Sequence, residues 1–134
     1  MATIHREIQI EADPDRVWAA VRDAGAVHER LAPGFVVDVR YDGTARDVTF
    51  ANGMVVRELI VTIDDDACRL AYTAINGRST HHNASMQVFA NGEGSRLVWI
   101  TDLLPNEVAE PVRGMVEQGL RTIKQTLERA ARGG

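Results

Sequence analysis

The feature of this sequence that most restricts its fold is a series of short apolar-rich runs between Phe35 and Leu104, followed by one long amphipathic segment. The runs are rich in valine, isoleucine, threonine and aromatic residues, as is typical of strands. Asp-Gly and Asn-Gly pairs of the kind that close hairpins separate some of them. The turns are at Asp42-Gly43, Asn52-Gly53, Asp64-Asp65-Asp66, Asn76-Gly77 and Asn91-Gly92-Glu93-Gly94. The pattern predicts a meander of about six antiparallel strands.

A strand and two short helices are predicted before this meander. Ile4, Ile8 and Ile10 share one face of the first segment, which is the period-two pattern of a half-buried strand. Asp13-Pro14-Asp15 then starts a helix, because an acid can cap free N–H groups and the fixed φ of proline suits the first helical position. A second short helix is expected from Ala26 to Leu31, before Ala32-Pro33-Gly34.

The segment after Pro105 predicts one long helix, because its apolar positions recur at three- and four-residue steps. These positions are Val108, Val112, Met115, Val116, Gly119, Leu120, Ile123 and Leu127. Gly114 and Gly119 each cost the helix about 1 kcal/mol relative to alanine, and such glycines usually mark close packing or a bend. The order of elements predicts an α+β fold in which the sheet curls around this helix. A pocket for apolar molecules is expected where sheet and helix diverge.

Composition restricts the classes of function. The 134 residues, taken as one domain (1–134), carry 15 basic and 19 acidic side chains, and Lys124 is the single lysine. This balance argues against binding nucleic acid, which needs clustered cations. No stretch approaches the roughly 20 apolar residues that span a bilayer, and the charged N-terminal residues argue against a signal peptide. We therefore expect a cytoplasmic location and no membrane partner.

Metal and cofactor chemistry are not expected. Cys68 is the only cysteine, which excludes an internal disulfide and a multi-cysteine metal site. His81 and His82 are adjacent, so on a strand they point to opposite faces and cannot hold one ion together. His82 is expected to be a hydrogen-bonded structural residue, with a role as proton carrier near Glu58 or Tyr72 as the alternative.

Alternation assigns side chains to the interior of the predicted sheet. The expected inward sets are Leu70, Tyr72 and Ala74; His82, Ala84, Met86 and Val88; and Leu97, Trp99, Thr101 and Leu103. Phe35, Val37, Val39 and Tyr41 are predicted to share one face of their strand. The strand from Met54 to Ile63 is ambiguous. One of its faces combines Val55, Leu59, Val61 and Ile63 with Arg57, and the other combines Val56 and Ile60 with Glu58.

Three segments together resemble a known family: Ile10 to Trp18, the meander, and Val98 to Pro105 with Gly119 to Lys124. They look like the START/Bet v 1-like (SRPBCC) superfamily, specifically its bacterial polyketide cyclase/dehydrase-type branch. The resemblance covers nearly the whole chain. It implies the helix-grip fold, a seven-stranded antiparallel sheet curled around a long C-terminal helix, with two short helices after the first strand. Because these motifs are structural, they identify the fold better than the chemistry.

The resemblance also bears on Glu58. Related hormone receptors point an acid at this place of the strand into the cavity, which makes Glu58 the first polar candidate. Its functional interpretation is a general acid or base, or a hydrogen-bond partner of a ligand, with a pKa raised by burial. The alternative is a solvated strand glutamate.

The leading hypothesis is a protein that binds a small hydrophobic or aromatic molecule between sheet and helix, as a monomer or a homodimer. The alternative is a polyketide cyclase/dehydratase-like enzyme that uses Glu58, His82 or Tyr72 as an acid-base residue in the same cavity. A module that docks another protein is a third hypothesis, which the charged outer faces of most strands disfavour. The residues expected at the ligand site are Phe35, Glu58, Ile60, Tyr72, His82, Met86, Trp99, Val112, Met115 and Gly119.

Overall fold

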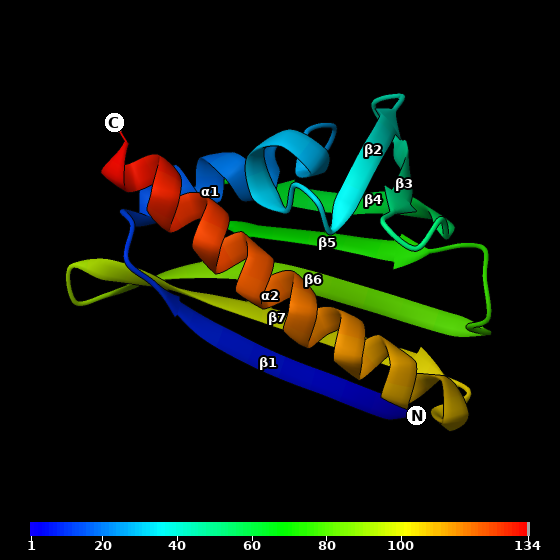
Figure 1. Cartoon of the computed structure of the whole chain (residues 1–134). Coiled ribbons are helices and arrows are strands. Elements are labelled where there is room, and N and C mark those ends of the chain that lie inside the picture. The colour runs from blue at the N-terminus through cyan, green and yellow to red at the C-terminus, as the bar shows by residue number, and fades with distance from the viewer. Residues whose placement is uncertain (134) are drawn as a thin grey trace.

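A curled antiparallel sheet wraps around one long helix in the computed structural model, which describes residues 1–133 (Figure 1). The strands are β1 (Ala2–Ile10), β2 (Val36–Tyr41), β3 (Ala45–Phe50), β4 (Val55–Asp64), β5 (Arg69–Ala74), β6 (His81–Asn91) and β7 (Gly94–Leu104). The helices are α1 (Pro14–Arg22), the π-helix η1 (Val27–Leu31), the 3-10 turn η2 (Asn106–Val108) and α2 (Ala109–Arg132). The predicted α+β helix-grip fold is confirmed.

The sheet consists of the predicted meander and one long-range pairing. Its strand order is β1-β7-β6-β5-β4-β3-β2, so β2 to β7 follow one another while β1 pairs with β7, Ala2 opposite Leu103. Turn chemistry explains the hairpin between β2 and β3. The Asp42 carboxylate accepts the backbone N–H groups of Thr44 and Ala45, each at 2.8 Å, and Gly43 supplies the positive φ of 94°.

The first helix starts as predicted and is fastened to the sheet by an acidic turn. The Asp13 carboxylate accepts the N–H of Asp15 at 2.8 Å, and Pro14 is the first helical residue. Asp65, between β4 and β5, accepts Trp18 Nε1 at 2.9 Å and Arg22 Nε at 2.7 Å. Hydrogen bonding to Arg22 and then to Trp18 lowers the pKa of the Asp65 carboxyl. The ionised Asp65 therefore holds α1 over one end of the sheet.

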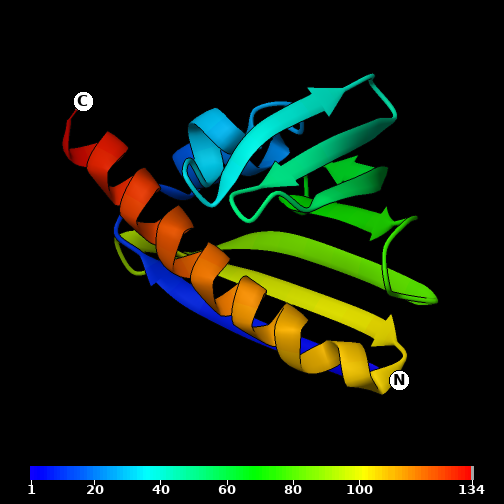
Figure 2. The same cartoon turned by 45° about the vertical axis from the view of Figure 1, so that its right-hand side comes forward.

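The two halves of α2 are buried to different degrees. Its second half runs toward α1 and η1 (Figure 2) and buries Leu120, Ile123 and Leu127. Gly119 marks close packing, because a Cβ there would lie 3.0 Å from Trp99 Cζ3 and 3.2 Å from Phe35 Cε2. Gly114 does not, since a Cβ there would meet nothing within 4 Å. No helix within residues 1–133 is both long and apolar enough to cross a bilayer.

Two β-bulges explain where simple alternation fails. The prediction that Phe35, Val37, Val39 and Tyr41 share one face is wrong, since the pairing of β2 with β3 shifts between Val36 and Asp38. Val36 and Val39 are therefore the buried residues of β2, and Val37 is 52% exposed. A second shift lies between Ile60 and Thr62 of β4. It explains the ambiguous strand, since Glu58 points inward before this shift and Ile63 packs on the core after it.

Candidate functional site

Two adjoining cavities lie between the sheet and α2. The outer one has a volume of about 190 Å³ and the inner one about 50 Å³. Five residues border both cavities and so form the boundary between them: Phe35, Phe50, Glu58, Tyr72 and Trp99. The predicted hollow between sheet and helix is therefore present, divided by a largely aromatic partition.

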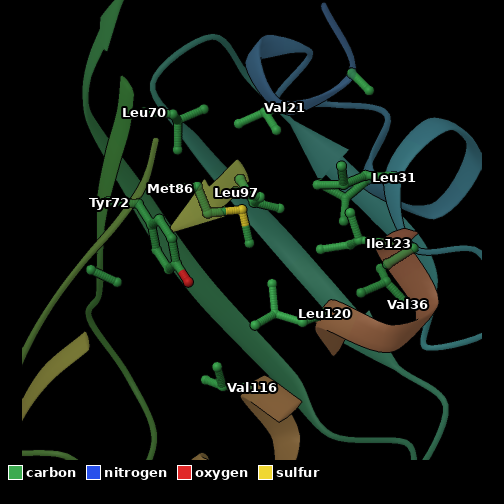
Figure 3. Packing of buried hydrophobic residues seen from close by; sticks show 14 of the residues in the cluster. Val21, Leu31, Val36, Leu70, Tyr72, Met86, Leu97, Val116, Leu120 and Ile123 are labelled. Carbon is green, nitrogen blue, oxygen red and sulfur yellow. The ribbon is translucent and has the colours of Figure 1, made fainter. Parts of the chain in front are cut away.

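The inner cavity is lined mostly by apolar side chains from α1, η1, the sheet and the second half of α2 (Figure 3), with Arg46 and Glu58 as its charged lining residues. Val21, Leu31, Leu70 and Ile123 are among them. The Tyr72 hydroxyl projects from β5 into this apolar interior, toward Leu120 (Figure 3). A polar group in such surroundings needs a hydrogen-bond partner, and the indole N–H of Trp99 is that partner.

The outer cavity lies under the first half of α2 and opens between loops. Val112 and Met115 line it from the helix, Met54 lines it from the turn between β3 and β4, and Asn76 to Ser79 line it from the loop between β5 and β6. These loop residues are largely exposed, so they form its rim. A molecule in this cavity is in contact with both the sheet and α2.

All but one of the residues predicted for the ligand site border a cavity; their role toward a ligand stays a prediction. Phe35, Glu58, Tyr72 and Trp99 border both cavities, Met86 and Gly119 the inner one, and His82, Val112 and Met115 the outer one. Ile60 borders neither, although it was expected to do so. Its side chain packs against the hydrophobic core, so core side chains fill the space in front of it.

The polar centre of the partition is an ion pair between Arg46 of β3 and Glu58 of β4. Arg46 Nε donates to Glu58 Oε1 at 2.8 Å, and Nη1 donates to the carbonyl oxygen of Ala24 at 3.2 Å. The two residues are only 5% and 8% exposed. Burial raises the pKa of the Glu58 carboxyl, and the adjacent Arg46 guanidinium offsets part of that rise.

Arg46 was missed by the sequence reasoning, although a signal for it exists. In the β3–β4 hairpin, Arg46 lies directly opposite Glu58. Counting outward from the Asn52-Gly53 turn places these two opposite charges on the same face of the hairpin. Once Glu58 points inward, Arg46 must therefore do so as well.

Tyr72 and Trp99 form the second polar contact of the partition. Trp99 Nε1 donates to the Tyr72 hydroxyl oxygen at 3.0 Å. The guanidinium carbon of Arg46 lies 5.3 Å from the centroid of the Tyr72 ring, within cation–π range. Burial, and then the negative charge of Glu58, raise the pKa of the Tyr72 hydroxyl. Tyr72 is therefore a neutral hydrogen-bond donor at ordinary pH.

His82 makes the kind of hydrogen bond expected of a structural residue. Its Nδ1 accepts the backbone N–H of Ala74 at 3.0 Å, which places the proton of the neutral ring on Nε2. Burial, and then the charge of His81, lower the pKa of His82, so the neutral ring predominates. As predicted, the two histidines point to opposite faces: His81 is exposed and His82 lines the outer cavity.

The family of the protein follows from its sequence and agrees with this geometry. Residues 1–129 match the family model described as polyketide cyclase / dehydrase and lipid transport. The chain belongs to this family. No curated protein matches the sequence significantly.

Several solved structures have the same fold as this protein. A protein from Bacillus thuringiensis has 17% sequence identity and a TM-score of 0.83, over 94% of this chain and 98% of that one. A point mutant of norcoclaurine synthase from Thalictrum, solved in complex with a transition-state analogue, has 21% sequence identity and a TM-score of 0.71. The match covers 96% of this chain and 95% of that one. BexL, a di-domain ARO/CYC from the BE-7585A biosynthetic pathway, has 16% identity and a TM-score of 0.82, over 96% of this chain and 47% of BexL. At these identities the likeness extends to the fold alone.

Proposed function

We propose that this protein binds a small hydrophobic or aromatic molecule in the outer cavity, with one end of the molecule at the partition. The observation that carries the proposal is the apolar hollow of about 190 Å³ between sheet and helix. An engineered apolar cavity of about 150 Å³ binds benzene, so the outer cavity has room for a six-membered ring with substituents. The family description, which includes lipid transport, supports the same class of ligand.

Apolar burial supplies most of the binding free energy in this proposal. Each Å² of apolar ligand surface removed from water contributes roughly 25 cal/mol. Val112 and Met115 provide such surface on the helix side, and Phe50 and Trp99 provide it at the partition. The few polar groups of the cavity then orient the ligand.

A pair of tryptophan substitutions on α2 tests the proposal, with 2-methylnaphthalene as the probe and calorimetry as the measurement. Val112→Trp places a bulky ring in the outer cavity, so we expect the affinity to fall at least about tenfold, since a filled cavity loses most of the apolar contact area. Gln118→Trp adds the same ring at an exposed position of the same helix and should leave the affinity unchanged. Equal binding by the wild type and Val112→Trp would contradict the proposal.

An acid-base enzyme of the cyclase/dehydratase kind is the second candidate function. The buried Glu58 carboxyl favours it, because it borders both cavities and has a raised pKa. Norcoclaurine synthase and the ARO/CYC BexL have the same fold at low identity, which is compatible with catalysis in this cavity. In this case Glu58→Gln abolishes turnover of a poly-β-ketone analogue while the affinity for a hydrocarbon probe is retained. Unchanged turnover in Glu58→Gln would remove Glu58 as the acid-base residue.

A further inference from the structure

A chain of hydrogen bonds runs through the partition and is interrupted once. On one side, Trp99 Nε1 donates to the Tyr72 oxygen, which leaves the proton of the Tyr72 hydroxyl to be donated. On the other side, Arg46 Nε donates to Glu58 Oε1. Within residues 1–133, no group donates to Glu58 Oε2 and the Tyr72 hydroxyl donates to no acceptor. The chain therefore ends in a donor on Tyr72 and an acceptor on Glu58.

The two residues at this interruption border the same cavities. Glu58 and Tyr72 border the inner and the outer cavity, and each is a buried residue of the sheet's inner face. The free oxygen of Glu58 is not sealed off by protein, because it is not among the fully buried side-chain atoms that lack a partner. Tyr72 carries its hydroxyl on a ring that borders both cavities. A group that arrives through the outer cavity can therefore reach both.

We infer that the ligand of the proposed binding function carries a hydroxyl group at its inner end, which accepts from the Tyr72 hydroxyl and donates to Glu58 Oε2. This inference rests on the proposed function and names its ligand class. A hydroxyl is a single oxygen that both donates and accepts, so it completes the chain from Trp99 through Tyr72 and Glu58 to Arg46. The aromatic side chains of Phe35, Phe50 and Trp99 border the same place and favour a ring next to that oxygen. The ligand class is a phenol or a comparable ring-borne alcohol.

Other polar end groups fit this site less well. A carbonyl or ether oxygen accepts from Tyr72 but leaves Glu58 Oε2 without a donor, and a buried carboxylate oxygen without a partner is costly. An ammonium group donates to Glu58 but cannot accept from Tyr72. A carboxylate places a second negative charge beside Glu58. A hydrocarbon end satisfies neither group.

Three naphthalene probes that differ at one position test the inference on the wild-type protein. They are 2-naphthol, 2-methylnaphthalene and 2-naphthoate, with dissociation constants measured by calorimetry at neutral pH. Hydrogen bonds to charged groups are worth enough that we expect 2-naphthol to bind about 10- to 100-fold more tightly than 2-methylnaphthalene. We expect 2-naphthoate to bind more weakly than 2-naphthol, because Glu58 repels its carboxylate.

Two variants locate the preference on the residues named. Glu58→Gln keeps an oxygen for Arg46 and presents an amide donor in place of Oε2, so the ratio of the two affinities should fall toward one. Tyr72→Phe removes the other hydrogen bond and should lower the ratio partly. Tyr41→Phe is the matched control, because Tyr41 lies outside both cavities and its hydroxyl bonds to the carbonyl oxygen of Gly43. It should leave the ratio unchanged.

The outcomes separate this inference from the function on which it rests. Equal affinities of the wild type for 2-naphthol and 2-methylnaphthalene would overturn the hydroxyl assignment and leave the apolar binding function standing. Tighter binding of 2-naphthoate would also overturn it, because Arg46 would then be the group that selects the ligand. Binding of none of the three probes would overturn both proposals. The ratio is measured on the wild type, so the inference stays testable even if Glu58→Gln does not fold.

Discussion

The two halves of α2 have the same apolar spacing but different surroundings. In the second half, Leu120, Ile123 and Leu127 are buried against the core. In the first half, Val112 and Met115 are only partly buried and line the outer cavity. The comparison teaches that one helix can complete a core at one end and roof a cavity at the other. What differs is whether the sheet and the short helices fill the space in front of it.

The boundary between the two halves lies at Gly119. The missing side chain there lets the rings of Trp99 and Phe35 reach the helix backbone, and both rings belong to the partition. The packed half and the hollow half are therefore separated by residues that the ligand is proposed to touch. Substitutions on either side of this boundary, and within it, can break the comparison or make it sharper.

The largest effect is expected from the ion pair within the partition. Arg46→Met leaves Glu58 as a buried charge without its partner, so the free energy of unfolding in urea should fall by about 3–5 kcal/mol. Arg57→Met is the matched control, because Arg57 faces outward from β4 and pairs with the part-exposed Asp47 at 3.1 Å. Its effect should be far smaller, since exposed pairs contribute little. Similar losses of unfolding free energy in both variants would show that the buried ion pair is as accessible to water as a surface pair.

Truncations along α2 test the two halves directly. Leu127→Ala removes a side chain that is fully packed in the second half, and should lower the free energy of unfolding by about 2–5 kcal/mol. Met115→Ala removes a partly buried side chain beside an existing hollow, so the loss should be about 1 kcal/mol or less. Chemical denaturation of the two variants measures both values. Equal losses would contradict the distinction between a packed and a hollow half.

The two glycines of α2 provide a smaller and opposite pair of effects. Gly114→Ala meets no neighbour and should raise the free energy of unfolding by about 1 kcal/mol through helix propensity alone. Gly119→Ala brings its methyl group against Trp99 and Phe35, so we expect no gain in stability and weaker binding of 2-naphthol. Thermal unfolding and calorimetry measure these quantities. If Gly119→Ala is more stable than the wild type and binds 2-naphthol equally well, then Trp99 and Phe35 can move away from the added methyl group and the prediction is wrong.

The smallest expected effect is a dependence of stability on pH that arises from the ionisation of Glu58. Its pKa is raised above the ordinary value of 4.5, so the folded state disfavours the ionised form. The wild type should therefore lose stability relative to Glu58→Gln as pH rises from about the ordinary value through the raised one. The difference between the two unfolding free energies, measured in urea across this range, isolates the effect because other titrating groups are common to both proteins. A difference that grows in favour of the wild type would contradict the raised pKa.

Most of the fold could be predicted from local patterns. The turn residues placed the hairpins, Asp13 and Pro14 placed the start of α1, and three- and four-residue spacing placed α2. Alternation also assigned Tyr72, His82 and Trp99 to the inner face, where they line the cavities. These features depend on neighbours along the chain, which is why sequence patterns carry them.

The errors arise where the structure depends on pairing between strands. A bulge at Val36–Asp38 inverts the face of β2, and nothing in the alternation of β2 itself indicates the extra residue. The burial of Arg46 follows from its position opposite Glu58, and the bond between Trp99 and Tyr72 joins β7 to β5 across β6. Ile60 lies on the expected side of the sheet, but how far the core extends in front of it is a property of the packed molecule.

The pairing of β1 with β7 has a consequence for how the molecule is made. Ala2 lies opposite Leu103, so β1 cannot acquire its partner until the ribosome has released almost all of the sheet. At a synthesis rate of about 5–20 residues per second, β1 has no strand partner for several seconds, while the hairpins from β2 onward can already form. Of the seven strands, the one that is synthesised before the others is thus paired late, and its apolar face stays unpaired while the rest of the sheet is being made.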